Sequence, residues 1–188
     1  LPDLLDFDGP NYANYVWSGY LVPLNDLISE DVLANVSPSI IAQGTYPADG
    51  QLYSLGQFDS GLALWGRKSL LEAAGVRIPT GVDDAWSGEE FEAALDALQA
   101  LDGIEYALDM KMNYGQGEWF SYGFSPIVQS FGGDFINRET WRADGTINGE
   151  GAVAAMTTFQ SWINDGHVVP ASAGDDSFYG AMSSALAF

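Results

Sequence analysis

The sequence predicts an α/β fold. Strand-like apolar segments alternate with segments of helical periodicity along the 188 residues, which is the pattern of α/β domains. Hydrophobic residues make up 47% of the chain, enough for a packed core in one domain or two small ones. The stretch 53–68 is central, because it has room for two buried strands, 52–58 and 62–65, joined by Asp59-Ser60-Gly61. Such a break suits a crossing between domains, although a buried hairpin would give the same pattern.

The first fifty residues predict one strand end and several short helices. Residues 4–7 are expected to end a strand. Asp8 and Pro10 are typical of a helix start, so a helix is predicted to about Trp17, with Gly19 closing it. Further helices are predicted at 31–36 and 39–45, followed by a turn at 47–50.

This first predicted helix is rich in aromatic and amide side chains. We expect Tyr15 and Trp17 to pack into the core. Four neighbours follow a predicted strand at its carboxyl end, where open α/β sheets bind ligands. Packing and ligand contact are both open for these four, which are Asp6, Asp8, Asn11 and Tyr12.

The remainder of the chain continues the alternation. Ser87 and Glu90 have the spacing of a capping box and predict a helix to about Leu101. The helix expected at 119–131 begins with an aromatic cluster in which Trp119 and Tyr122 share a face, either as core or as a ligand platform. The helix expected at 150–164 has an apolar stripe of Val153, Met156, Phe159 and Ile163. Other helices are predicted at 67–74 and 177–182, and strands at 104–110, 135–137 and 185–188.

Composition excludes several classes of function. The net charge is −20 with six Lys and Arg in total, so nucleic acid and anionic membrane surfaces are not expected as partners. There is no cysteine, and the single His167 excludes a two-histidine zinc site. Phosphate-binding loops and a serine-nucleophile elbow are absent as well, so no cofactor and no metal are predicted. No apolar run reaches the roughly 20 residues that span a bilayer.

The two ends predict an incomplete chain. It begins Leu1-Pro2-Asp3, with neither Met nor a leader, and it ends within a strand-like segment. We therefore expect a fragment or a processed chain, in which a signal peptide cannot be judged.

A recurring combination of side chains indicates carbohydrate. Asp, Asn, Gln and Ser recur beside Trp and Tyr at predicted strand ends and helix starts. Carboxylates and amides hydrogen-bond paired hydroxyls, while aromatic rings stack on the apolar faces of a sugar. A core also needs aromatic residues, so this signal suggests a sugar site without specifying one.

The order of several motifs resembles the extracellular solute-binding proteins of carbohydrate ABC transporters, the family that includes maltose-binding protein. The similarity runs through nearly the whole chain in the same order. The matching motifs are Pro2-Asp3-Leu4-Leu5, Ser18-Gly19-Tyr20-Leu21, Gly50-Gln51-Leu52-Tyr53, Asp59-Ser60-Gly61-Leu62, Arg67-Lys68-Ser69-Leu70-Leu71, Trp86-Ser87-Gly88-Glu89-Glu90-Phe91 and Gln129-Ser130-Phe131-Gly132-Gly133.

The resemblance implies a type II periplasmic-binding-protein-like fold, in which two three-layer αβα lobes are joined by hinge strands. Residues 1–58 would be part of the N-terminal lobe and 59–188 part of the C-terminal lobe, with the family's first strands and its C-terminal part missing. By position, a sugar-contacting loop matches Asp6, Phe7 and Asp8, a hinge-proximal polar site matches Asp59 and Ser60, and a stacking aromatic matches Tyr122. The chain departs from the family at Trp65-Gly66-Arg67, where Tyr-Asn commonly precedes the lysine.

Three hypotheses follow. The first is a non-enzymatic, monomeric, bacterial receptor that captures a mono- or oligosaccharide and delivers it to ABC transporter permease subunits. Its location would be periplasmic or extracellular, with lipid anchoring left open. The alternative is a glycoside hydrolase using two of Asp6, Asp8 and Asp59, which needs a defined carboxylate separation and one raised pKa. The third is a structural or adhesive fragment that binds no small ligand.

Overall fold

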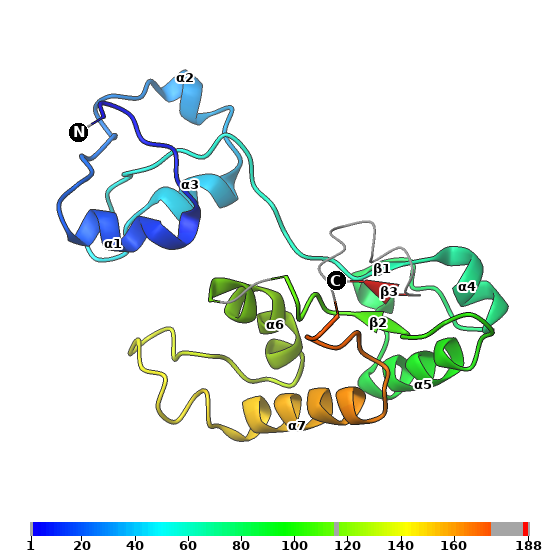
Figure 1. Ribbon diagram of the computed structural model, residues 1–188. Coiled ribbons are helices and arrows are strands. Elements are labelled where there is room, and N and C mark those ends of the chain that lie inside the picture. The colour runs from blue at the N-terminus through cyan, green and yellow to red at the C-terminus, as the bar shows by residue number, and fades with distance from the viewer. Residues whose placement is uncertain (1, 115–116, 174–185, 188) are drawn as a thin grey trace. The chain divides into compact units, whose positions relative to one another are not determined.

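The computed structural model describes residues 2–114, 117–173 and 186–187. The chain divides into two compact units, Leu1–Gly61 and Leu62–Phe188, each of which is described by itself below (Figure 1). The predicted α/β composition is confirmed: short strands form one sheet in the second unit, and helices make up most of the regular structure in both.

The first unit is built from short helices. These are η1 (Gly9–Asn11), α1 (Tyr12–Trp17), α2 (Glu30–Leu33) and α3 (Pro38–Gly44). The turn predicted at 47–50 is confirmed, and it closes an isolated bridge between Thr45 and Leu52. Proline occupies the first turn of η1 and of α3, where its missing N–H needs no partner.

Two predictions for the first unit are wrong. Residues 4–7 form no strand, and 92% of Leu4 is exposed, because no neighbouring strand pairs with them among the described residues. Trp17 is 80% exposed instead of packing in the core, and the buried ring of α1 belongs to Tyr12. A hydrophobic side chain does not by itself fix which side of a short helix faces inward.

The stretch 53–64 does not contain the predicted strand pair. Leu52 makes its isolated bridge and Trp65–Gly66 forms β1, but the residues between them are not in strands. Phe58 is 82% exposed. This stretch spans the boundary between the two units after Gly61. Tyr53 N–H donates to the Gly44 carbonyl oxygen at 2.9 Å, but the backbone after Tyr53 has no ladder partner among the described residues. The hydrophobic residues of this stretch predicted strands. A strand also needs a neighbouring strand to pair its backbone hydrogen bonds, and local hydrophobicity does not show whether one is present.

The second unit contains a sheet of three short strands. They are β1 (Trp65–Gly66), β2 (Leu108–Asp109) and β3 (Leu186–Ala187), in the order β1-β3-β2. β3 pairs antiparallel with β1 and parallel with β2. The strands predicted at 104–110 and 185–188 are therefore confirmed over two residues each, whereas 135–137 forms no strand.

Helices of the second unit follow the predicted order. They are α4 (Lys68–Ala73), α5 (Gly88–Gln99), α6 (Glu118–Ser130) and α7 (Glu150–Asn164), together with the 3₁₀ turn η2 (Val82–Asp84). The predicted capping box is present, because Glu90 N–H donates to Ser87 Oγ and Ser87 N–H donates to the Glu90 carboxylate. The helix predicted at 177–182 lies outside the described residues.

The core of the second unit packs α5, α6 and α7 against the sheet. Leu95 and Leu98 of α5 are fully buried, as is Leu108 of β2. The Phe91 and Trp162 rings join α5 to α7 with centroids 5.1 Å apart.

The sequence pattern predicted the wrong side of α7 to face the core. Val153, Met156 and Ile163 are largely exposed. The buried positions are Ala152, Ala155, Phe159 and Trp162. Of the predicted stripe, only Phe159 faces the core. Ala152 and Ala155 lie where α7 packs against α6, because their small side chains let the two helices approach closely. A hydrophobicity pattern gives little weight to alanine and so does not predict this face.

Gly151 marks a close approach between the α7 start and the chain after α6. A Cβ added to Gly151 would lie 2.6 Å from the carbonyl oxygen of Phe131, and one added to Gly133 would lie 2.6 Å from the nitrogen of Ala152. We expect Gly151→Ala to lower the free energy of unfolding by about 1–3 kcal/mol, the usual cost of overpacking. Gly88→Ala in the first turn of α5 is the control, since its Cβ would meet nothing within 4 Å. Equal urea midpoints for the two variants would contradict this prediction.

Arg77 links the loop before α5 to the first turn of that helix. Its guanidinium lies 2.8 Å from the Asp84 carboxylate and 3.0 Å from the Glu90 carboxylate. Hydrogen bonds from Arg77 and from the Ser87 backbone lower the pKa of Glu90 below its ordinary value of 4.5. Hydrogen bonds from the Thr80 backbone and hydroxyl, with the Arg77 charge, lower the pKa of Asp84 below 3.8.

These lowered pKa values predict an acid-dependent loss of stability. A carboxyl whose pKa is lower in the folded state stabilises the fold above its unfolded pKa, and this contribution is lost as the pH falls through the folded pKa. We expect the free energy of unfolding to decline below about pH 4.5, and to decline less steeply in Arg77→Gln. Urea unfolding across pH 3–6 measures this, and parallel curves for the two proteins would disprove it.

Candidate functional site

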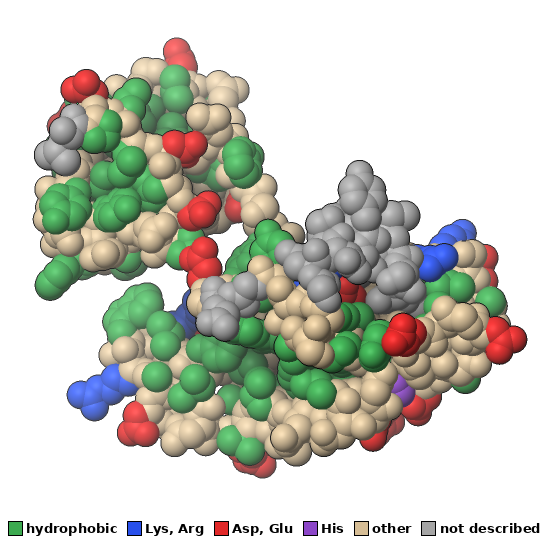
Figure 2. All heavy atoms as spheres, viewed as in Figure 1, with side chains coloured by type: hydrophobic (Ala, Val, Ile, Leu, Met, Phe, Trp, Pro, Cys, Tyr) green, Lys and Arg blue, Asp and Glu red, His purple; other side chains and the backbone are tan. Residues whose placement is uncertain are grey.

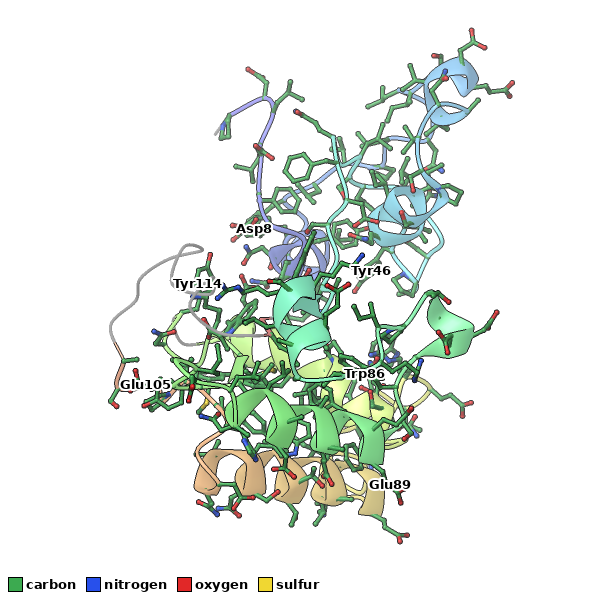
Figure 3. All side chains as sticks on the ribbon, turned by 90° about the vertical axis from the view of Figure 1, so that its right-hand side faces the viewer. Asp8, Tyr46, Trp86, Glu89, Glu105 and Tyr114 are labelled. Carbon is green, nitrogen blue, oxygen red and sulfur yellow. The ribbon has the colours of Figure 1, made fainter. Side chains whose placement is uncertain are left out.

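Three aromatic side chains gather where β2 leads into α6. Tyr114 lies in the connecting loop, where Figure 3 labels it, and Trp119 and Tyr122 are in the first turns of α6. The Trp119 ring meets Tyr114 edge-on at 5.2 Å and Tyr122 edge-on at 6.2 Å between centroids. Tyr114 is 60% exposed and Tyr122 45% exposed, so the cluster reaches solvent. We call these three residues the aromatic cluster.

The indole of Trp119 is anchored at its polar edge. Its Nε1–H donates to the carbonyl oxygen of Lys111 at 2.9 Å. Gly123 lies one turn further along α6, and a Cβ there would come within 2.9 Å of the indole Cε2. The glycine therefore leaves space that the indole occupies on the helix.

Beside this anchor lies a buried ion pair. The Lys111 ammonium is 3.0 Å from the Asp109 carboxylate, and both residues are buried. Lys111 is two residues beyond the end of β2 and has a positive φ of 50°. The site thus combines aromatic rings with a charged pair at the carboxyl end of a strand, where open α/β sheets bind ligands.

In the first unit, the predicted site residues at 6–12 lie on the segment that enters α1. Asp6, Asp8 and Asn11 are exposed, and Phe7 is half-buried with its ring edge-on to Tyr15 at 5.2 Å. Asp8 precedes η1 without a side-chain capping hydrogen bond. Three exposed polar groups are therefore free to face solvent on one short segment.

Tyr12 differs from its neighbours because it is in the core. Its hydroxyl donates to the carbonyl oxygen of Gly44, which joins α1 to α3. Burial, with a smaller effect of the Asp49 charge, raises the pKa of Tyr12 to about 12. Tyr12 therefore has a packing contact, and its role as a ligand-binding residue stays a prediction.

Asp59 and Ser60 lie at the end of the first unit and are exposed. The Asp59 carboxylate accepts from Gln43 Nε2 at 3.0 Å and from the Ser60 N–H at 2.9 Å. Hydrogen bonds from Ser39 and Gln43 lower the pKa of Asp59, so this side chain is a carboxylate near neutral pH.

Of the predicted residues, the structure places Trp119 and Tyr122 side by side. Both are in the second unit, and the other seven belong to the first. Sequence reasoning missed Asp109, Lys111 and Tyr114. Their position was the available signal, since Asp109 is near the end of the strand predicted at 104–110 and Lys111 and Tyr114 follow that strand. Nothing in the local pattern pairs Asp109 with Lys111.

Acidic side chains are dispersed over the visible faces of both units (Figure 2). Within 2–114, 117–173 and 186–187, no three His, Asp or Glu side chains are grouped to hold a metal ion. None of the helices in this described part is long and apolar enough to cross a membrane.

Solved structures share this fold. The GacH receptor of Streptomyces glaucescens, solved unliganded and with acarbose, has a TM-score of 0.71 and 23% identity, over 95% of this chain and 43% of its own. UgpB from Mycobacterium tuberculosis, in complex with glycerophosphocholine, has a TM-score of 0.73 and 20% identity, over 94% and 43%. The cyclic alpha-maltosyl-1,6-maltose binding protein of Arthrobacter globiformis has a TM-score of 0.68 and 23% identity, over 94% of this chain and 43% of its own. The fold is that of type II periplasmic binding proteins.

Sequence comparison gives the family. A family model described as bacterial extracellular solute-binding protein matches residues 1–184, and this chain belongs to that family. Binding proteins of Brucella abortus and Brucella suis are 24% identical over 164 residues, which is 84% of this chain. The chain spans 35% of the length of these curated relatives and less than half of the solved structures. The sequence-based assignment to the solute-binding proteins is confirmed.

Proposed function

We propose that this chain is part of an extracytoplasmic sugar receptor, which captures a mono- or oligosaccharide and delivers it to the permease subunits of an ABC transporter. The observation that carries the sugar assignment is the aromatic cluster at the carboxyl end of β2. Trp119, Tyr122 and Tyr114 offer partly exposed rings beside hydrogen-bonding groups. Rings of this kind stack on the C–H faces of a sugar.

Membership of the family supports this proposal. The GacH receptor is solved with acarbose, the Arthrobacter globiformis protein is a cyclic alpha-maltosyl-1,6-maltose binding protein, and an ABC substrate-binding protein from Listeria monocytogenes is in complex with cycloalternan. UgpB is in complex with glycerophosphocholine, which makes a polar non-sugar solute the competing ligand class.

We assign the ligand contacts to two lobes. Residues 1–58 belong to the N-terminal lobe and 59–188 to the C-terminal lobe, a division close to the boundary after Gly61 between the compact units. Asp6, Phe7, Asp8 and Asn11 contribute from the first lobe, and Asp59 and Ser60 from the hinge. Ligand binding would favour the closed population of the lobes. The receptor acts as a monomer.

A glycoside hydrolase is the less favoured alternative. Hydrolysis needs one carboxyl group with a raised pKa to act as the general acid. The pKa of Asp59 is lowered by its hydrogen bonds from Ser39 and Gln43, so Asp59 itself does not meet this requirement. Because the family is one of solute-binding proteins, we propose a binding protein that leaves its ligand chemically unchanged.

Calorimetry on the full-length protein tests the proposal. The panel contains glucose, maltose, maltotriose, α-cyclodextrin and glycerophosphocholine, and each solution is checked afterwards for products. Binding at micromolar or lower Kd to a sugar that is recovered intact supports the receptor. Product formation would favour the hydrolase, binding of glycerophosphocholine alone would replace the sugar, and no binding would overturn the sugar assignment.

A further inference from the structure

The Asp109–Lys111 pair has no role in the sugar contacts proposed above. Asp109 is 3% and Lys111 9% exposed, and the ammonium lies 3.0 Å from Asp109 Oδ2. Removing two charges from water costs free energy, and the attraction between them in the protein interior often does no more than offset that desolvation penalty. A buried pair is therefore weak evidence for a contribution to stability, and another role has to be sought.

Asp109 holds Lys111 at two points. Oδ2 binds the side-chain ammonium, and Oδ1 accepts the backbone N–H of Lys111 at 2.8 Å. Between these two contacts the Lys111 backbone has a φ of 50°. Such a conformation is uncommon for residues other than glycine and persists where surrounding contacts hold it.

This backbone conformation of Lys111 also affects the position of Trp119. The carbonyl oxygen of Lys111 is the acceptor for the indole Nε1–H at 2.9 Å. Backbone angles set the direction of a carbonyl group. Because Asp109 holds the Lys111 backbone and side chain, it also fixes the direction of the Lys111 carbonyl, and with it the position of the indole edge. Gly123 lies against the ring, where a Cβ would be 2.9 Å from Cε2. The indole is therefore fixed by contacts at its edge and on the helix.

We propose that the Asp109–Lys111 pair positions the indole of Trp119 as the stacking surface for the ligand. The proposal rests on the proposed function, because the ligand that stacks is the sugar. Asp109 and Lys111 are positioning residues that act through Trp119. Since each charge neutralises the other, the pair adds no net charge beside the ring, which suits an uncharged sugar better than a phosphorylated one.

The test combines indole NMR with calorimetry. The double substitution Asp109→Asn and Lys111→Met removes both charges and keeps an acceptor for the backbone N–H of residue 111. We expect the Trp119 Nε1–H signal, assigned by its loss in Trp119→Phe, to shift and exchange faster with solvent. The other tryptophan signals should keep their positions. Asp134→Asn, which breaks the ion pair with Arg138 in the same unit, is the matched control and should leave the Trp119 signal unchanged.

Sugar binding provides the second readout. For each panel sugar that the unaltered protein binds, we expect the double variant to raise Kd about tenfold, a change of 1.4 kcal/mol. In the Trp119→Phe background the same double substitution should change Kd less than twofold, because residues acting through one another do not add. Full additivity would mean that the pair acts independently of Trp119 and would overturn the proposal.

The outcomes separate this proposal from the sugar assignment. An unmoved Trp119 signal in the folded double variant overturns the positioning role, even where sugars bind. A moved signal without binding of any panel sugar supports positioning and removes the sugar function. Where the double variant does not fold, Lys111→Met alone repeats the NMR test, because it removes the ammonium from the ion pair and leaves Asp109 Oδ1 as acceptor for the backbone N–H of residue 111. An unmoved signal there also overturns the proposal.

Discussion

Replacing Trp119 with alanine is expected to weaken binding of the receptor's sugar about 30-fold or more. The indole lies at the centre of the aromatic cluster, between Tyr114 and Tyr122, and is fixed by its hydrogen bond to Lys111. Truncating a central aromatic anchor usually costs about 2 kcal/mol or more of binding free energy, and 1.4 kcal/mol is tenfold in Kd. Calorimetry with the best-bound sugar of the panel measures this effect.

Trp141→Ala is the matched control for this prediction. Trp141 is also a tryptophan of the second unit, 64% exposed, in the loop between α6 and α7. It is outside the aromatic cluster, and we expect its truncation to change Kd less than twofold. Equal losses in the two variants would show that the sugar does not depend on the cluster specifically. Tyr122→Ala should give an intermediate loss, since this ring is at the edge of the cluster.

The largest effect on stability is expected for Trp162→Ala. This side chain is 7% exposed and packs against Phe91 and Phe159 in the core of the second unit. Truncation of a buried aromatic residue removes apolar burial and leaves a cavity, which together cost about 3–5 kcal/mol. Urea unfolding monitored by far-UV circular dichroism measures the loss, and the slope of the transition should stay close to that of the unaltered chain.

Met156→Ala on the same helix provides the comparison. Met156 is 44% exposed on α7, although the periodicity of the sequence predicts it to be buried. We expect its truncation to cost less than about 0.5 kcal/mol, as at other exposed positions. A loss comparable to that of Trp162→Ala would mean that α7 presents the face predicted from the sequence rather than the one seen here.

The candidate site illustrates how much the sequence reveals about function. Trp119 and Tyr122 were identified as a pair from their spacing on a helix, and their rings do lie 6.2 Å apart. Asp109 and Lys111 were not identified, because the burial that brings their charges together is set by the fold and not by the local pattern. The role of Tyr12 was left open by the sequence, and its burial against Gly44 could be known only from the fold.

By itself the sequence determined the α/β class, the family and the positions of the longer helices. The capping box of α5 and the bounds of α7 depend on residues close together in the chain, and local hydrogen bonds and periodicity are readable there. Only the tertiary structure decided which apolar stretches became strands and which face of α7 is buried. Residues 54–58 belong to a predicted strand but have no pairing partner among the described residues, while β3 pairs with both β1 and β2. Strand pairing and helix burial depend on neighbours distant in sequence, and a local pattern does not contain them.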